Sequence, residues 1–294
     1  MLRFAFAWLA ALALAGCGQD APPPAPQQSA IAPALWEIRD GDGALEGWLF
    51  GTIHALPDGI QWETTEIAET IRAADLLVVE IADPESIGAP SATFVNLAYT
   101  FGQPPVLERV DEDYRIALQR QIERSGRSEA ELRVLETWAL ALALSKGTGV
   151  GDPANGADRT LVAAFSDREV RELEGLEAQL ALFDRLPEDD QRALLQGVLE
   201  ETEAQRRDPA RLTRAWLAGD IDTLAGETHR GILADPELRE ALLAGRNRAW
   251  AGTIEAMLTE DDLPLIAVGA AHLAGPDGLP VLLRGAGYAV ERVQ

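Results

Sequence analysis

Two apolar runs of strand type each end at a histidine. The first covers residues 47–53 and is followed by His54, and the second covers residues 264–271 and is followed by His272. In both runs a glycine stands three positions before the histidine. Ligands of open α/β sheets gather at the carboxyl ends of strands, so we expect the fold to bring these two histidines together.

The pattern between these runs predicts more of the sheet. Residues 35–39 alternate between apolar and polar positions, as a half-buried strand does. Residues 63–74 carry apolar positions at helical spacing, and residues 76–81 form a buried strand with Glu80 near its end. This strand–helix–strand order is typical of a parallel crossover, so His54 and Glu80 are expected to face one crevice.

The middle of the chain is mostly helical by its pattern. Helices are predicted over residues 106–126, 128–146, 159–166, 180–186, 188–205, 208–218, 221–230, 236–258 and 279–285. Shorter strand patterns cover residues 169–173 and 288–293, and residues 147–158 are rich in Gly, Asp and Pro, as loops are. The sequence therefore predicts an α/β fold, with a central mostly parallel or mixed sheet, flanking helices and a largely helical middle insertion.

The N-terminus has the pattern of a targeting segment. Residues 1–16 are apolar and rich in Ala and Leu, and they are too short to span a bilayer comfortably. They end in Leu-Ala-Gly before Cys17, which resembles a bacterial lipobox, and an ordinary cleaved signal peptide is the alternative. The Pro- and Gln-rich residues 17–33 are expected to form a tether to a domain at residues 34–294. We expect a periplasm-facing protein of the cell envelope, lipid-anchored through Cys17, and Gly18 favours the outer membrane.

Charge and cysteine content exclude some partners and an intramolecular disulfide. Asp and Glu number 48 and Lys and Arg 25, so the net charge is −23. Nucleic acid and anionic lipid surfaces both require clustered basic side chains, so neither is an expected partner. The single cysteine excludes an intramolecular disulfide.

An ordered set of short motifs resembles the TraB/GumN family. The set begins with Gly51-Thr52-Ile53-His54 and a strand ending at Glu80, and it closes with Gly269-Ala270-Ala271-His272. Between them lie Gly156-Ala157-Asp158, Gly175-Leu176-Glu177, Trp216-x-x-Gly219-Asp220 and Arg246-Asn247-x-x-Trp250. The resemblance covers about residues 35–293. This family is similar to the Tiki proteins, which are metal-dependent proteases with two Gly-x-x-His motifs and a Glu, and to the group of erythromycin esterases and ChaN-like haem-binding lipoproteins.

The resemblance implies a hydrolytic site. His54 and His272 would be metal ligands, with Glu80 as a third ligand or the general base. Two imidazoles and a carboxylate suit a divalent metal such as Zn, Mn or Co, which would activate water. The implied function is a metal-dependent, peptidase-like hydrolase acting on a peptide or small-molecule substrate.

Other residues would support this site. Arg246 is expected to stabilise an oxyanion, and Gly51 and Gly269 would let backbone and substrate approach closely. Three residues are expected to orient the imidazoles: Asp158, Glu177 and Asn247.

Two alternatives to the metal-dependent peptidase stay open. Glu80 or a histidine could activate water without a metal, as the esterase resemblance suggests. The crevice could also bind a haem or a peptide without catalysis, with a histidine as axial ligand. Asp158 is equally interpreted as a helix cap. The third histidine, His229, lies on a polar stretch and is expected at the surface.

Overall fold

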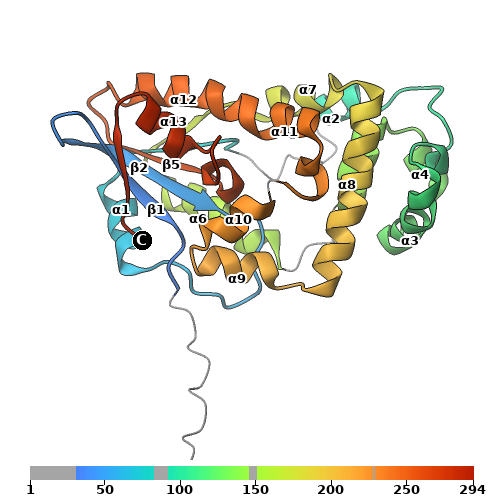
Figure 1. The fold of residues 1–294 in the computed structure, drawn as a ribbon, viewed down its shortest axis with the longest axis horizontal. Helices are drawn as coiled ribbons and strands as arrows, with labels where there is room; N and C mark the ends of the chain where they lie inside the picture. Colours follow the sequence, from blue (N-terminus) through green and yellow to red (C-terminus); the bar gives the residue numbers. More distant parts are fainter. Residues whose placement is uncertain (1–30, 83–91, 146–150, 228) are drawn as a thin grey trace, which may run out of the picture.

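The computed structural model describes residues 31–82, 92–145, 151–227 and 229–294. The predicted signal segment, Cys17 and most of the predicted tether lie outside these residues. The described chain forms a mixed α/β fold around one six-stranded sheet, as the sequence predicts (Figure 1). None of its described helices is long and apolar enough to cross a membrane.

The sheet is mostly parallel. Its strands are β1 (Leu35–Arg39), β2 (Leu45–Thr52), β3 (Leu76–Val79), β4 (Glu169–Glu172), β5 (Pro264–Gly269) and β6 (Ala289–Arg292), in the order β4-β3-β5-β2-β1-β6. Neighbouring strands from β4 to β2 are parallel, whereas β1 is antiparallel to both β2 and β6. The carboxyl ends of β3, β5 and β2 therefore lie side by side, although their residues are far apart in sequence.

Alternate strand residues pack against helices on opposite faces of the sheet, because successive side chains of a strand point to opposite sides. On one face Phe50 and Leu77 belong to a core with Trp216, and on the other Leu49 and Ile266 belong to a core with Trp250. The first layer of helices comprises α1 (Thr65–Ala73), α6 (Ala157–Ala164), α9 (Arg211–Leu217) and α10 (Ile221–Glu227). The second layer comprises α12 (Gly245–Met257) and α13 (Leu279–Gly285).

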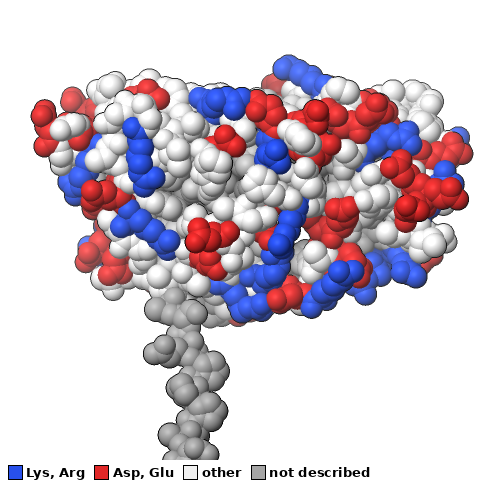
Figure 2. Space-filling model, viewed as in Figure 1, with Lys and Arg blue, Asp and Glu red and all other residues white. Residues whose placement is uncertain are grey.

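The predicted helical insertion has a core of its own. Trp138 is fully buried at its centre, beside Phe94 and Phe183. The helices around this core are α2 (Ala92–Ala98), α3 (Arg115–Ser125), α4 (Glu129–Arg133), α5 (Thr137–Ser145), α7 (Leu176–Asp184), α8 (Glu188–Arg207) and α11 (Pro236–Arg239). Acidic and basic side chains are interspersed over the face of the molecule seen in Figure 2.

Two helices predicted in this insertion, over residues 106–126 and 128–146, are wrong as continuous helices. Short 3-10 turns at Val106–Glu108 and Glu112–Tyr114 precede α3, and residues 134–136 separate α4 from α5. The buried side chain of Arg109 lies between these segments. It donates hydrogen bonds to the carbonyl oxygens of Pro104, Arg133 and Leu135, at 2.6 to 3.0 Å. These three carbonyl oxygens therefore have a hydrogen-bond donor without a continuous helix.

The helix predicted over residues 236–258 forms with a π-helical turn inside it, and the strand predicted over 264–271 ends two residues earlier, at Gly269. A π-helical turn, Glu240–Ala244, separates α11 from α12. Gly245 permits that turn, because a Cβ there would lie 2.8 Å from the Glu240 carbonyl oxygen. Strand β5 stops at Gly269, whose N–H binds the Glu80 carboxylate, and a 3-10 helix, Ala270–Leu273, carries His272.

Candidate functional site

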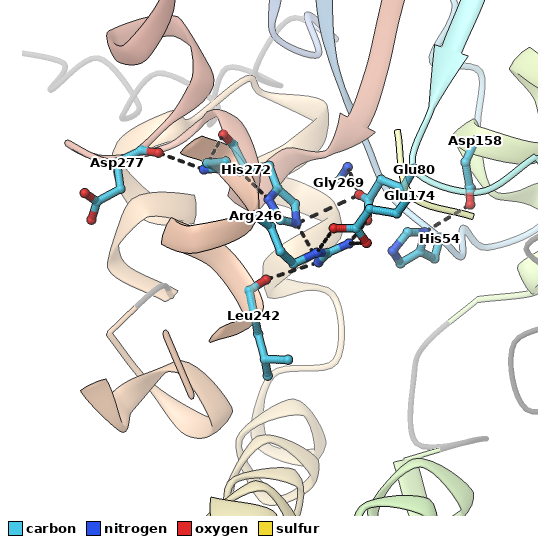
Figure 3. Close-up of polar contacts among 10 residues, drawn as sticks. His54, Glu80, Asp158, Glu174, Leu242, Arg246, Gly269, His272 and Asp277 are labelled. Carbon is cyan, nitrogen blue, oxygen red and sulfur yellow. Dashed lines mark hydrogen bonds and ion pairs between the residues drawn. The ribbon is translucent and has the colours of Figure 1, made fainter. Parts of the chain in front are cut away.

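The carboxyl ends of three adjacent strands bring His54, Glu80 and His272 into one region (Figure 3). Glu80 directly follows β3, and His54 lies two residues beyond β2. The Glu80 Oε1 and His272 Nε2 atoms are 4.0 Å apart. His54 and Glu80 line the same small cavity, so the crossover pattern of the sequence places these side chains as it predicts.

His54 presents one ring nitrogen to the crevice. Its Nδ1 lies 3.0 Å from Oδ2 of Asp158, in the first turn of α6, and its side chain is 72% exposed. The hydrogen bond to Asp158 raises the pKa of His54 to about 8, because the carboxylate favours the protonated ring. When the ring is neutral, a proton on Nδ1 leaves the Nε2 lone pair free.

Glu80 is held as a carboxylate. Its Oε1 accepts the Gly269 N–H at 2.8 Å, and its Oε2 accepts a hydrogen bond from Arg246 Nη2 at 2.8 Å. Burial of Glu80 favours its protonated form. The charges of the surrounding His272, Arg246 and His54 side chains and the Gly269 hydrogen bond outweigh burial and lower the pKa to about 2.

His272 differs from His54 in burial and in protonation. Its side chain is buried, and burial lowers its pKa to about 4, so the ring is neutral at pH 7. Its Nδ1 lies 2.6 Å from Asn247 Oδ1, which can only accept, so Nδ1 carries the proton. Its Nε2 lies 3.2 Å from Arg246 Nη1, and the ring packs on Trp250 with centroids 4.4 Å apart.

Arg246, near the start of α12, has an acceptor for each of its five N–H groups. They are Glu174 Oε1 for Nε, Leu242 O and His272 Nε2 for Nη1, and Glu80 Oε2 and Glu174 Oε2 for Nη2. A guanidinium has five N–H donors. Arg246 is therefore a clamp that fixes Glu80 and His272, and it has no remaining N–H for the oxyanion contact that the sequence analysis assigned to it.

Two of the three residues expected to orient the imidazoles do contact them. Asp158 binds His54, and Asn247 binds His272 as described above. Glu177 is exposed on α7, and no hydrogen bond described for the structure joins it to either ring. The carboxylate that enters the site is Glu174. Its position just after β4, like that of Glu80 after β3, is the signal that sequence reasoning missed.

The glycines of the histidine motifs allow close packing. A Cβ on Gly51 would lie 3.1 Å from Cβ of Ala270, in the 3-10 helix that carries His272. A Cβ on Gly269 would lie 3.3 Å from Glu80 Oε1. Gly156 is tighter still, because a Cβ there would lie 2.5 Å from the His54 carbonyl oxygen.

The cavity at the strand ends is small. It has a volume of about 50 Å³ and is lined by Thr52, His54, Val79, Glu80, Ile81, Asp158, Gln179 and Ala267. A second, larger cavity of about 750 Å³ is lined by Glu174 and Arg246 and by residues of α11, the π-helical turn and α12. The smaller cavity has room for one functional group beside His54, and the remainder of a substrate would lie outside it.

The donor types at the site suit a divalent metal, but Arg246 binds His272 Nε2, and both oxygens of Glu80 already accept hydrogen bonds. His54 and Glu80 line the crevice, whereas His272 Nε2 lies 3.2 Å from Nη1 of Arg246. Within the described ranges, no group of three or more His, Cys, Asp or Glu side chains is arranged to hold a metal ion. His272 could join His54 and Glu80 as a ligand only after Arg246 had moved away from it.

Fold and site together define an α/β protein with a polar crevice at the carboxyl edge of a mixed sheet. The sequence model of the TraB/PrgY/gumN family matches residues 34–292, so the chain belongs to that family. "Uncharacterized protein YbaP" of Escherichia coli (strain K12) is 30% identical over 244 residues, which cover 80% of this chain and 87% of that protein. The protein of the same description from Shigella flexneri matches equally. No solved structure matches the chain significantly.

Proposed function

We propose that the protein is a hydrolase in which His54 activates a water molecule. The observation that carries this proposal is the hydrogen bond of 3.0 Å between His54 Nδ1 and Asp158 Oδ2. A carboxylate bound to one ring nitrogen fixes the tautomer and orientation of the ring, as a general base requires. The free Nε2 belongs to a side chain that lines the crevice together with the permanently ionised Glu80.

The proposed reaction is the attack of a water molecule on a substrate carbonyl group. Nε2 of neutral His54 takes a proton from water, and the water oxygen forms a bond to the substrate carbonyl carbon. The carbonyl π electrons move to its oxygen and return when the bond to the leaving group breaks. Protonated His54 then gives its proton to the leaving group. Glu80 accepts a hydrogen bond from the other O–H of the water and so orients the water molecule. The Arg246 clamp holds the Glu80 carboxylate in place.

A metal-dependent peptidase is the second candidate, and the donor set favours it. His54, Glu80 and His272 would hold the ion, with Arg246 displaced from His272. A metal there would lower the pKa of a bound water and polarise a carbonyl group. The residues Asp158 and Asn247 would keep their roles, because each fixes the ring nitrogen that faces away from the crevice.

Activity measurements with and without metal separate the two candidates. Hydrolysis of a panel of peptides, aryl amides and aryl esters would be followed after dialysis against a chelator, and again after addition of Zn, Mn or Co. Turnover that survives chelation supports water activation by His54, and turnover that returns only with metal supports the peptidase. Absence of turnover under all conditions in a folded protein would contradict the hydrolase proposal, and a haem or peptide titration would then test a binding role.

We also propose that the protein is attached to a membrane of the cell envelope through lipid on Cys17. The lipobox-like residues before this cysteine support the proposal. Metabolic labelling with palmitate should mark the wild-type protein and leave Cys17→Ser unlabelled. A wild-type protein that takes up no label would contradict the anchor.

A further inference from the structure

Three polar groups that line the small cavity are not used by the interactions described above. Thr52 ends β2 and is only 4% exposed, it lines the cavity, and no hydrogen bond of its hydroxyl is described. Two further residues of the cavity lining each have a buried oxygen with no hydrogen-bond partner among the described residues: Gln179 Oε1 and Asp158 Oδ1. Leaving a buried polar atom without a hydrogen bond is unfavourable, so these two oxygens point to a ligand group that donates to them.

The unpartnered groups are complementary in type. The Thr52 hydroxyl can donate a hydrogen bond, whereas Gln179 Oε1 and Asp158 Oδ1 can only accept one. Arg246 has an acceptor for every N–H and the Gly269 N–H binds Glu80, so neither is free for a ligand, whereas no hydrogen bond is described for the Gln179 amide nitrogen. A ligand group that fits must therefore offer an acceptor to Thr52 and an N–H or O–H donor to the two oxygens.

We propose that Thr52 and Gln179 hold the reacting group of the substrate, and that this group is a carboxamide with at least one N–H. The Thr52 hydroxyl donates to the amide carbonyl oxygen and to the oxyanion that forms from it. The Gln179 amide oxygen accepts the substrate N–H. An ester of the same shape lacks the N–H and leaves the buried oxygen unsatisfied, so the cavity selects amides over esters.

This inference rests on the proposed hydrolase, and a binding experiment separates the two. The protein has three histidines, so its imidazole NMR signals can be assigned and followed. Acetamide and N-methylacetamide carry N–H groups, whereas N,N-dimethylacetamide and methyl acetate do not. We expect saturable shifts of the His54 signals with the first two probes and at least tenfold weaker binding of the last two. Equal binding of all four probes, or no saturable shift with acetamide, would overturn the inference even if the protein hydrolyses other substrates.

Substitutions identify the residues responsible. Thr52→Val and Gln179→Leu keep the side-chain volume but remove the hydrogen bond, so each should weaken acetamide binding about tenfold. Thr52→Ser and Gln179→Glu keep a hydroxyl and an acceptor, and should retain binding. Gln121→Leu is the matched control, because Gln121 Oε1 is also buried without a partner in the described chain but lines a different cavity beside α3. Loss of acetamide binding in this folded control, or retention in both Thr52→Val and Gln179→Leu, would contradict the assignment.

Hydrolysis provides a test that is separate from acetamide binding. If the wild type hydrolyses a matched aryl amide and ester, Gln179→Leu should lower the ratio of their kcat/KM values about tenfold in favour of the ester. An unchanged ratio with hydrolysis intact would reject the recognition role of Gln179 and leave the hydrolase proposal standing. Binding of acetamide without any hydrolysis would retain the recognition site and reject the hydrolase.

Discussion

The two histidines of the Gly-x-x-His motifs have opposite protonation behaviour, although their sequence settings are alike. His54 is bound to the Asp158 carboxylate, which raises its pKa, whereas burial lowers the pKa of His272, whose Nδ1 is bound to the Asn247 amide. Their partners come from α6 and α12, far from either motif in sequence. The Asp158 carboxylate therefore suits His54 to proton transfer, whereas burial keeps His272 neutral and Asn247 fixes its tautomer.

The hydrogen bond from Asp158 is testable at His54 itself. Asp158→Asn removes the carboxylate, so the pKa of His54 should fall from about 8 towards 6.5. An NMR titration of the imidazole signals measures this shift, with His272 in the same spectra as an internal control that stays neutral at pH 7. A His54 pKa near 8 in the variant would show that Asp158 is not the cause.

Burial of His272 should make folding stability depend on pH. Its folded pKa of about 4 lies below the unfolded value of 6.5, so the unfolded chain takes up the proton first. Its contribution is complete above about pH 6.5 and is lost as pH falls towards 4, by about 2–3 kcal/mol between pH 7 and 4.5. Urea unfolding at these two pH values should show a smaller loss in His272→Gln than in wild type. Equal losses would contradict a buried neutral ring.

At the scale of elements, α12 delivers the clamp that joins three strand ends. Arg246 on this helix is buried against Glu80 and Glu174. Arg246→Met would leave two buried carboxylates without their cation, which should cost about 3–5 kcal/mol of unfolding free energy. Arg248→Met on the same helix removes an exposed ion pair with Glu240 and should cost less than about 1 kcal/mol. Urea unfolding compares them, and similar costs would reject the clamp.

The turn before α6 fixes the backbone of His54. A Cβ at Gly156 would lie 2.5 Å from the His54 carbonyl oxygen, so Gly156→Ala should displace His54 and lower both stability and hydrolysis. Gly252→Ala in α12 is the control, because no atom lies within 4 Å of its Cβ position and alanine favours a helix. Thermal unfolding and activity of both variants check this. A Gly156→Ala protein as active as wild type would show that the close approach is unimportant.

The sequence predicted the sheet elements well and the helix interruptions poorly. Runs of apolar residues placed β2, β3 and β5, and the crossover rule then placed His54 beside Glu80. The break between α4 and α5 depends on Arg109, which reaches across from another segment, and a local pattern contains no sign of that contact. Glu174 follows β4 much as Glu80 follows β3, which is a local sign of a strand-end carboxylate, but its contact with Arg246, 72 positions along the chain, has no local sign.

At the scale of the whole molecule, the excess of acidic side chains opposes the compact state. The net charge is −23, and salt screens the mutual repulsion of surface charges. The melting temperature should therefore rise when NaCl is raised from low concentration to about 0.5 M. Calorimetry measures the change across a series of NaCl concentrations. A melting temperature that falls with salt would mean that attractive ion pairs dominate instead.

The most direct test of the account is the kcat/KM of hydrolysis for wild type, His54→Gln and His229→Gln. The control is the third histidine, which is exposed and contacts Arg239 away from the crevice. General base catalysis contributes about 10²–10⁴-fold, so His54→Gln should lose activity by that factor while His229→Gln stays close to wild type. The wild-type rate should also rise with pH through about 8, as His54 loses its proton. Full activity of a folded His54→Gln protein would contradict the central claim.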